Sequence, residues 1–285
     1  MMPFVSVIIP TYNRAHLVQR AIRSVLCQSY TDYEIVVVDD GSTDSTHEIV
    51  REAFPEIAVI TQLHAGVSAA RNKGIQHSTG RLLAFLDSDD EWLPEKLSRQ
   101  VNLYGSNGTE FICHTDEIWM RNGEPVSQKG IHRKQGGKFF ERALERCLIS
   151  PSSVMISRGL LDQVGWFDPE LPAAEDYDLW LRITAFHSVD FVPEKLVVKH
   201  GGSGDQLSMT TQAIDIFRIR AITKILANAD LQPEYRRAAV KELVRKCRIV
   251  ALGCSKRGKE HEADTYLELA RSYTNSDGEP ECSGS

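Results

Sequence analysis

The first 90 residues alternate between short apolar runs and segments of helical periodicity, which restricts the fold more than any other feature of this sequence. Runs that are typical of buried strands lie at 4–9, 34–38, 57–61 and 81–86. Helices are expected between them at about 17–26, from a cap at Ser42 or Asp44 to Phe54, and over 67–77. Strands separated by helices of this length form βαβ units, so we predict an α/β fold with a Rossmann-like, mostly parallel sheet flanked by helices.

Beyond residue 90 the pattern is mixed, and it becomes purely helical near the end. After a helix that follows Pro94, we expect a strand near 110–120, a polar loop over 121–138, a helix at 139–148, a strand near 152–156, helices at 157–164 and 176–186, and short strands around 189–199. From about 211 to 273 only helices are indicated. The predicted organisation is therefore a main domain over 1–205, a helical C-terminal extension over 206–274 and a polar, disordered tail over 275–285.

Polar residues follow three of the predicted strands at their carboxyl ends. These clusters are Thr11-Tyr12-Asn13, Asp39-Asp40 and Asp87 to Asp90. Ligands of parallel α/β sheets bind beyond the carboxyl ends of the strands. The three clusters are therefore expected to line one cleft.

The cluster Asp87-Ser88-Asp89-Asp90 places three carboxylates within four residues. Their mutual repulsion disfavours the folded state unless a cation or hydrogen-bond donors compensate. Oxygen ligands of this kind suit Mg²⁺ or Mn²⁺, which bind one or two carboxylates together with phosphate oxygens of a substrate. A divalent ion there would neutralise the charge of a departing diphosphate, whereas a solvated acidic turn is the structural alternative.

Two further segments have features of a nucleotide site. Asp39 or Asp40 could accept a hydrogen bond from a base N–H or a ribose hydroxyl, while Ser42 and Asp44 cap the next helix. The helix that opens at Gly66 offers free N–H groups to anions, and Arg71 lies one turn inside it. Ordinary packing explains that second pattern equally well.

Glu175 to Arg182 begins an amphipathic helix with acidic residues in its first turn. The helix dipole alone favours carboxylates there. The functional interpretation makes Asp176 a general base that takes the proton of an acceptor hydroxyl. His200, at the end of a short strand, is a candidate third metal ligand or phosphate contact, although a lone histidine is usually neither.

Charge and cysteine content exclude several classes of protein. The net charge of −6 is unlike the basic surface of a nucleic-acid binder, so no nucleic-acid partner is expected. The six cysteines form no CxxC pair, which is typical of free thiols in a reducing cytosol. No signal peptide and no apolar run of about 20 residues is found, so we expect a cytoplasmic protein, with association at the inner face of the membrane left open.

The segment Glu234–Val250 is basic and amphipathic. Such helices either lie on anionic membranes or pack, with a solvated basic face, on the rest of the protein. Weak, salt-sensitive membrane contact through these C-terminal helices is the hypothesis that the sequence leaves open.

Six segments, taken together, resemble the family 2 glycosyltransferases, which are inverting enzymes with the GT-A fold. The matching segments are Val5 to Arg14, Asp39 to Ser42, Gly66 to Gly74, Asp87 to Asp90, Gly165 to Asp168 and Glu175 to Trp180. Each motif is loose, but their order and spacing hold over roughly residues 4–205. The QxxRW motif of the processive, membrane-embedded synthases of this family is absent, so repeated polymerisation through a membrane channel is not expected.

The resemblance implies a role for each matching position. The implied nucleotide-binding residues are Pro10, Thr11, Tyr12, Arg14, Asp39, Asp40, Arg71, Asp87 and Ser88. Asp89 would bind Mn²⁺ or Mg²⁺, with His200 as a further metal ligand near the ion and the diphosphate. Asp176 would be the base in a direct displacement that inverts the anomeric carbon.

The expected function is transfer of a single sugar from a nucleoside-diphosphate sugar, most commonly a UDP-sugar, to a hydroxyl of a glycan or lipid-linked saccharide. One alternative is a sugar-nucleotide nucleotidyltransferase, which would need a glycine- and lysine-rich loop where Pro10 to Asn13 stand. The other is a non-catalytic nucleotide-sugar-binding protein. A Rossmann dehydrogenase is disfavoured, because no GxGxxG follows the first strand.

Overall fold

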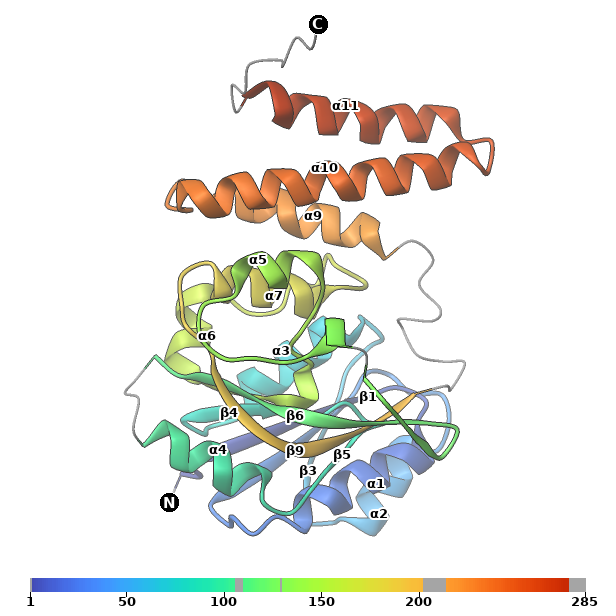
Figure 1. Cartoon of the computed structure of the whole chain (residues 1–285). Helices are drawn as coiled ribbons and strands as arrows, with labels where there is room; N and C mark the ends of the chain where they lie inside the picture. Colours follow the sequence, from blue (N-terminus) through green and yellow to red (C-terminus); the bar gives the residue numbers. More distant parts are fainter. Residues whose placement is uncertain (1, 106–109, 129, 202–213, 277–285) are drawn as a thin grey trace, which may run out of the picture.

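The computed structural model describes residues 2–105, 110–128, 130–201 and 214–276. A nine-stranded sheet crosses the molecule with helices on both faces, and three C-terminal helices lie in a further layer on one side (Figure 1). The strands are β1 Val5–Thr11, β2 Tyr33–Asp39, β3 Ala58–Thr61, β4 Leu82–Phe85, β5 Glu91–Trp92, β6 Ile112–Arg121, β7 Glu124–Val126, β8 Val154–Ser157 and β9 Asp190–Gly201. The helices are α1 Ala15–Leu26, α2 Thr46–Ala53, α3 Val67–His77, α4 Lys96–Tyr104, α5 Phe140–Glu145, α6 Arg158–Val164, α7 Glu175–Thr184, α9 Asp215–Leu226, α10 Pro233–Ser255 and α11 Glu260–Ser276, with short 3₁₀ turns η1 Gly130–His132 and η2 Pro151–Ser153.

The sheet has the strand order β3-β2-β1-β4-β8-β6-β9-β5, with β7 paired to β6. The four strands that we expected in the first 90 residues are β1 to β4, and they are parallel neighbours in the sheet. Strands β6 and β9 form another long parallel pair. The antiparallel pairings are short, so the sheet is mostly parallel, as the βαβ pattern predicts.

The parallel register brings the polar clusters to one edge. Thr11 pairs with Asp39, and Asp39 pairs with Thr61, so β1, β2 and β3 end side by side. Ile8 pairs with Phe85 at the end of β4, which places the acidic turn after β4 at the same edge. The expectation that separate segments meet beyond the strands' carboxyl ends is thus met at the level of the backbone.

Both faces of the central strands β1 and β4, and of β2 from Ile35 onward, are buried, which explains their continuous apolar runs. Val5, Val7 and Ile9 pack with the apolar face of α1 in one core. Ile8 points to the other face, where a second core extends through α5 and α7 to α9, α10 and α11. The C-terminal helices therefore pack on the part of the chain that holds the sheet, through a shared core.

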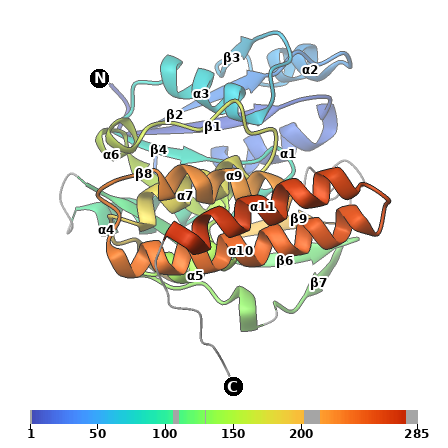
Figure 2. The ribbon, with the colours of Figure 1, turned by 90° about the horizontal axis from the view of Figure 1, so that it is seen from above.

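Figure 2 shows that α9, α10 and α11 cover the side of the molecule that holds α5 and α7 and leave β1, β2 and β3 uncovered. Helix α9 contacts α7, and α10 contacts α5, α9 and α11. The boundary expected at residue 205 lies outside the described residues and stays a prediction.

The structure corrects the sequence-based elements at three places. The short strands expected around 189–199 are one strand, β9, which is long because β6 pairs with it across an irregularity near Asp116. The loop expected over 121–138 contains β7 and η1. Helix α11 runs to Ser276, two residues into the expected tail, and the remainder of that tail lies outside the described residues.

Candidate active site

The turns after β1 and β2 are tied together at the predicted nucleotide edge. The backbone N–H of Asn13 donates to Ser42 Oγ at 2.9 Å, and Asn13 Oδ1 accepts from the Thr43 N–H at 2.7 Å. Asp39 Oδ1 accepts from the backbone and the hydroxyl of Ser42, at 3.0 and 2.5 Å. Gly41 is required in this turn, because its φ is +79° and a Cβ would lie 2.8 Å from the backbone nitrogen of His64.

Asp40 organises the loop that leads into α3. Its carboxylate accepts from Gln62 Nε2 at 2.6 Å, from the N–H groups of Ala65 and Gly66 at 2.9 Å each, and lies 2.9 Å from His64 Nδ1. The His64 ring thereby stacks on Tyr12, with centroids 4.1 Å apart. The structure thus gives Asp40 a loop-fixing role, and its predicted contact with a nucleoside stays a prediction.

Thr11 also lies at this edge. Its side chain is buried, and its Oγ1 has no hydrogen-bond partner among the described residues. A buried hydroxyl without a partner is costly and is a feature of ligand sites. The neighbouring Tyr12 ring is 39% exposed and offers a flat face beside that hydroxyl.

Arg71 is the centre of the site. It is 3% exposed; its Nη1 donates to Glu175 Oε1 at 2.6 Å and its Nη2 to Asp87 Oδ1 at 2.7 Å. The guanidinium lies over the Phe167 ring, 5.0 Å from its centroid. Burial opposes the charge of Arg71, but Asp87 and Glu175 outweigh it and hold its pKa above the ordinary value.

The carboxylates of the acidic turn are compensated by separate groups. Asp87 contacts Arg71, and Asp89 Oδ2 lies 3.1 Å from Arg14 Nη1. Asp90 points inward, accepts from Ser152 Oγ at 2.6 Å and lies 3.8 Å from Lys199 Nζ. Burial would raise the pKa of Asp87, but Arg71 and Lys199 keep it below the ordinary value.

Asp90 behaves differently from Asp87. Its burial, with the repulsion of Asp89 and Asp87, raises its pKa to about 7. Ser88, another predicted nucleotide contact, is buried in the same turn. The turn therefore holds one carboxyl, Asp90, that readily accepts a proton, beside two, Asp87 and Asp89, that are paired with arginines.

A metal ion at this turn would depend on the substrate for most of its ligands. No group of three or more His, Cys, Asp or Glu side chains that could hold a metal is found in the described part of the chain. Asp89, with 13% of its side chain exposed, offers carboxylate oxygen, which suits an ion that is completed by phosphate oxygens. His200 lies at the end of β9, and its Nε2 is 2.6 Å from Glu91 Oε1. Its predicted role as a metal ligand stays a prediction.

Asp176 lies in the first turn of α7, after Ala174, which adopts a left-handed conformation with φ of 61°. Its Oδ1 accepts from the Tyr177 N–H at 2.7 Å and its Oδ2 from Cys147 Sγ at 3.3 Å. Burial, reinforced by Asp176, raises the pKa of the Cys147 thiol well above its ordinary value, so the thiol remains a donor. Glu175, the preceding residue, contacts Arg71, which connects the start of α7 to the acidic turn.

Three charged residues of the site were not predicted as functional. Lys199 compensates the negative charge of the acidic turn, and Glu175 compensates the positive charge of Arg71. The third residue is Glu117 on β6, whose carboxylate helps to raise the pKa of Lys199. Glu175 carries a signal, since it stands in the quoted motif beside Asp176. Lys199 directly precedes His200, but its partner Asp90 lies in the turn after β4, far away in the sequence, so local sequence could not reveal it.

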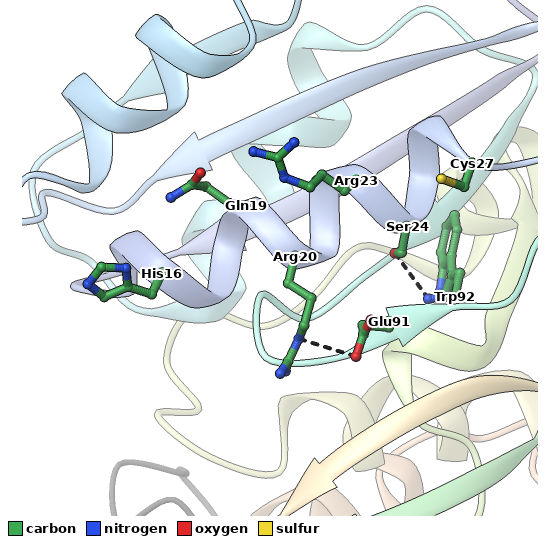
Figure 3. A pocket seen from close by; sticks show the side chains of 8 residues that line it. All are labelled: His16, Gln19, Arg20, Arg23, Ser24, Cys27, Glu91 and Trp92. Carbon is green, nitrogen blue, oxygen red and sulfur yellow. Dashed lines mark hydrogen bonds and ion pairs between the residues drawn. The ribbon is translucent and has the colours of Figure 1, made fainter. Parts of the chain in front are cut away.

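A cavity of about 550 Å³ lies beside this region, between α1 and β5 (Figure 3). Its lining residues are His16, Gln19, Arg20, Arg23, Ser24, Cys27, Glu91 and Trp92. None of the predicted site residues lines it. Arg20 connects it to the acidic turn, because its Nη2 donates to the Asp89 carbonyl at 2.6 Å and its Nε lies 3.3 Å from Glu91 Oε1.

Two solved structures share the architecture of this chain. The chain is similar to Staphylococcus aureus TarS 1–349 in complex with UDP-GlcNAc, with a TM-score of 0.67 and 19% identity over 98% of this chain and 93% of that one. It is also similar to the mannosyltransferase PcManGT from Pyrobaculum calidifontis in complex with GDP-Man and Mn²⁺, with a TM-score of 0.58 and 19% identity over 98% and 89% of the two chains. The fold is therefore the GT-A fold.

Residues 6–165 match the model of glycosyl transferase family 2, which is more than half of the chain. The chain belongs to that family, as the order of its motifs predicts. Among curated relatives, it is 33% identical over 193 residues to the UDP-Glc:alpha-D-GlcNAc-diphosphoundecaprenol beta-1,3-glucosyltransferase WfgD of Escherichia coli, covering 66% of this chain and 72% of that protein. It is 29% identical over 226 residues to the putative teichuronic acid biosynthesis glycosyltransferase TuaG of Bacillus subtilis, covering 76% and 88%.

Proposed function

We propose that this glycosyltransferase moves a single sugar, with inversion, from a UDP-sugar to a hydroxyl of a glycan or lipid-linked saccharide. The observation that carries the proposal is the Arg71 guanidinium, which pairs with Asp87 and Glu175 at once. This contact joins the acidic turn, where a diphosphate and its ion would lie, to the helix that carries Asp176. Family membership favours glycosyl transfer over the nucleotidyltransferase alternative.

In this proposal the hydroxyl oxygen of the acceptor attacks the anomeric carbon, Asp176 takes the proton of that hydroxyl, and the bond between the anomeric carbon and the diphosphate breaks. Thr11, Tyr12 and Asp39, with Asp40, Pro10 and Ser88 behind them, hold the nucleoside. Asp89, with His200 beside it, would hold Mn²⁺ or Mg²⁺, which would supply positive charge for the leaving diphosphate. Arg14 and Arg71 position the carboxylates of the acidic turn so that they can accept that ion.

The proton-acceptor role is tested with Asp176→Asn, which keeps the shape of the side chain. We expect transfer from UDP-glucose or UDP-GlcNAc to fall at least about a thousandfold, within the range that general-base removal produces, while the Kd for UDP changes less than about twofold. Glu170→Gln, a change of an exposed carboxylate near α7, is the matched control and should leave both quantities unchanged. Near-normal turnover by the Asp176 variant would show that another group accepts the proton.

The UDP preference is supported by the relatives that bind or use UDP-sugars, whereas the Pyrobaculum enzyme is complexed with GDP-Man. A thermal-shift series with UDP, GDP, dTDP and CMP, each with Mn²⁺, tests it, because a nucleotide that binds the folded state raises Tm. UDP should give the largest shift. Hydrolysis of the UDP-sugar without an acceptor would separate an enzyme from a non-catalytic binding protein.

We further propose weak contact of the protein with the cytoplasmic face of a membrane through the exposed side of α10. No helix among the described residues is long and apolar enough to cross a bilayer. The buried side of α10 packs within the core, while Lys241 and Arg248 are exposed together with Ile249 (46%) and Leu252 (59%). Cations beside exposed apolar side chains suit an anionic lipid surface.

Sedimentation with anionic vesicles tests this contact. We expect the protein to sediment with them at low salt and to remain in the supernatant at about 0.5 M salt, because charges are then screened within a few ångström. The double variant Lys241→Glu/Arg248→Glu should abolish sedimentation, and zwitterionic vesicles are the control. If wild-type protein stays in the supernatant with anionic vesicles at low salt, this contact does not occur.

A further inference from the structure

The far side of the candidate site holds an aromatic pair that the proposed reaction does not use. Trp119, near the end of β6, lies 5.1 Å from the ring of His132 in η1, with 57° between the ring planes. Both residues are only partly buried. The pair therefore presents ring surface to solvent rather than filling a core.

Strand register places Trp119 beside the acidic turn. Trp119 pairs with Lys199 in the parallel β6–β9 ladder, so the two side chains leave the sheet on the same face. The Lys199 amine lies 3.8 Å from Asp90. The indole is thus the cross-strand neighbour of a cation that contacts the acidic turn.

The indole is held by a fixed anion. Its Nε1 donates to Glu117 Oε2 at 2.9 Å, and Lys134 Nζ lies 2.7 Å from Glu117 Oε1. Burial would raise the pKa of Glu117, but Lys134 and Lys199 lower it to about 2, so this carboxylate stays ionised over the whole working pH range. The ring is therefore oriented before any ligand arrives.

The same carboxylate connects Trp119 to the candidate base. Ser150 donates its hydroxyl to Glu117, and Cys147, three residues earlier, donates its thiol to Asp176. The segment 147–150 therefore spans from the group that orients the indole to the group that would take the acceptor proton. An acceptor whose hydroxyl reaches Asp176 would have its ring or its neighbouring ring near Trp119.

Trp119 lies at the same carboxyl edge of the sheet as the acidic turn, but it is displaced along the sheet from the nucleotide residues on β1 and β2. Strands β4 and β8 separate β6 from β1, which corresponds to three strand spacings of about 4.8 Å, or about 14 Å. The diphosphate and the transferred sugar would occupy the space between them. The aromatic pair is thus on the side opposite to the Tyr12–His64 stack.

We propose that Trp119, oriented by Glu117 and flanked by His132, is the platform on which a pyranose ring of the acceptor stacks, a role that rests on the proposed glycosyl transfer. One face of a pyranose is a patch of C–H groups, which suits an indole face, while its hydroxyls need polar neighbours such as Gln128 at the rim. Gln128 is itself anchored, because its Nε2 donates to the Glu117 carbonyl at 3.0 Å. Trp119 thereby selects for sugar acceptors and against flexible, non-cyclic alcohols.

The test measures sugar binding without turnover. Saturation-transfer NMR with the methyl glycosides of glucose, galactose, mannose and N-acetylglucosamine, in the presence of UDP, should show ring protons of at least one glycoside in contact with the protein. Trp119→Leu should abolish that signal, and Trp119→Phe should reduce it. Trp166→Phe, a change of another partly buried tryptophan, should leave it intact.

The Kd for UDP is measured on the same samples and should change less than about twofold in the Trp119 variants, since the expected nucleotide site at β1 and β2 is separated from β6 by β4 and β8. In an assay of sugar transfer, Trp119→Leu should raise the KM for the acceptor at least about tenfold. Retention of the glycoside signal by Trp119→Leu, its absence in wild-type protein, or equal loss of UDP and glycoside binding would each overturn the platform. Failure of the proposed function would give a different result. Wild-type protein would then bind glycosides and Trp119→Leu would not, but neither protein would turn over a UDP-sugar.

Discussion

Removal of the Arg71 side chain should destabilise the protein more than any surface charge change. In Arg71→Ala the carboxylates of Asp87 and Glu175, whose side chains are 25% and 8% exposed, lose the guanidinium that contacts both, at 2.7 and 2.6 Å. Breaking a buried ion pair from one side costs about 3–5 kcal/mol, because an uncompensated charge remains in the interior. For a chain of this length, about 2 °C per kcal/mol gives a fall in Tm of roughly 6–10 °C.

Chemical denaturation monitored by circular dichroism at pH 7.5 measures this loss, and Arg99→Ala is the matched control. Arg99 also contacts two carboxylates, Glu95 at 3.0 Å and Glu194 at 3.2 Å, but 48% of its side chain is exposed. Exposed pairs contribute about 0–1 kcal/mol, so the control should lose little stability. Equal losses in the two variants would refute the view that burial decides the strength of the Arg71 contacts.

The pH dependence provides a second check on Arg71. The pKa of Asp87 is lowered in the folded protein, so its contribution to stability is present above the unfolded pKa and is lost as pH falls through the folded pKa. The difference between wild type and Arg71→Ala should therefore persist from pH 7.5 down to about 4 and shrink as the pH is lowered further. Arg71→Ala/Glu175→Gln should recover part of the loss at pH 7.5, because one of the two stranded charges is gone.

Three further outcomes follow from individual residues. Asp89→Ala should weaken UDP binding in the presence of Mn²⁺ at least about tenfold, while UDP binding in EDTA should change little. Isothermal titration measures both affinities, and an unchanged Mn²⁺ dependence would exclude Asp89 as a metal ligand. Gly41→Ala should destabilise the fold by about 1–3 kcal/mol and weaken UDP binding, because of its positive φ and the 2.8 Å approach to His64, and a stable, tightly binding variant in thermal shift would contradict this. Burial lowers the pKa of Lys96 to about 7, so wild-type stability should rise by up to about 1.4 kcal/mol per pH unit from pH 7 toward 10, whereas denaturation of Lys96→Met should lack this rise.

Local sequence determined much of this protein. Apolar, β-branched runs are buried on both faces of a parallel sheet, so they could be recognised without the structure, and α3 was predicted with its observed bounds, Val67–His77. Because parallel strands align their carboxyl ends, the acidic turn and Asp39 could also be assigned to one edge. Short strands such as β5 and β7 could not, since two or three residues carry no periodicity.

The pairing of charges was decided by the tertiary structure. Which cation compensates each carboxylate depends on strand order and on contacts between distant segments, such as Arg71 with Glu175, 104 residues along the chain. The sequence indicated that the acidic turn needs compensation, because three neighbouring carboxylates repel one another. Only the folded chain supplies Arg14, Arg71 and Lys199 from three different elements, because the strand order that brings β9 toward the turn after β4 is not encoded in any local pattern.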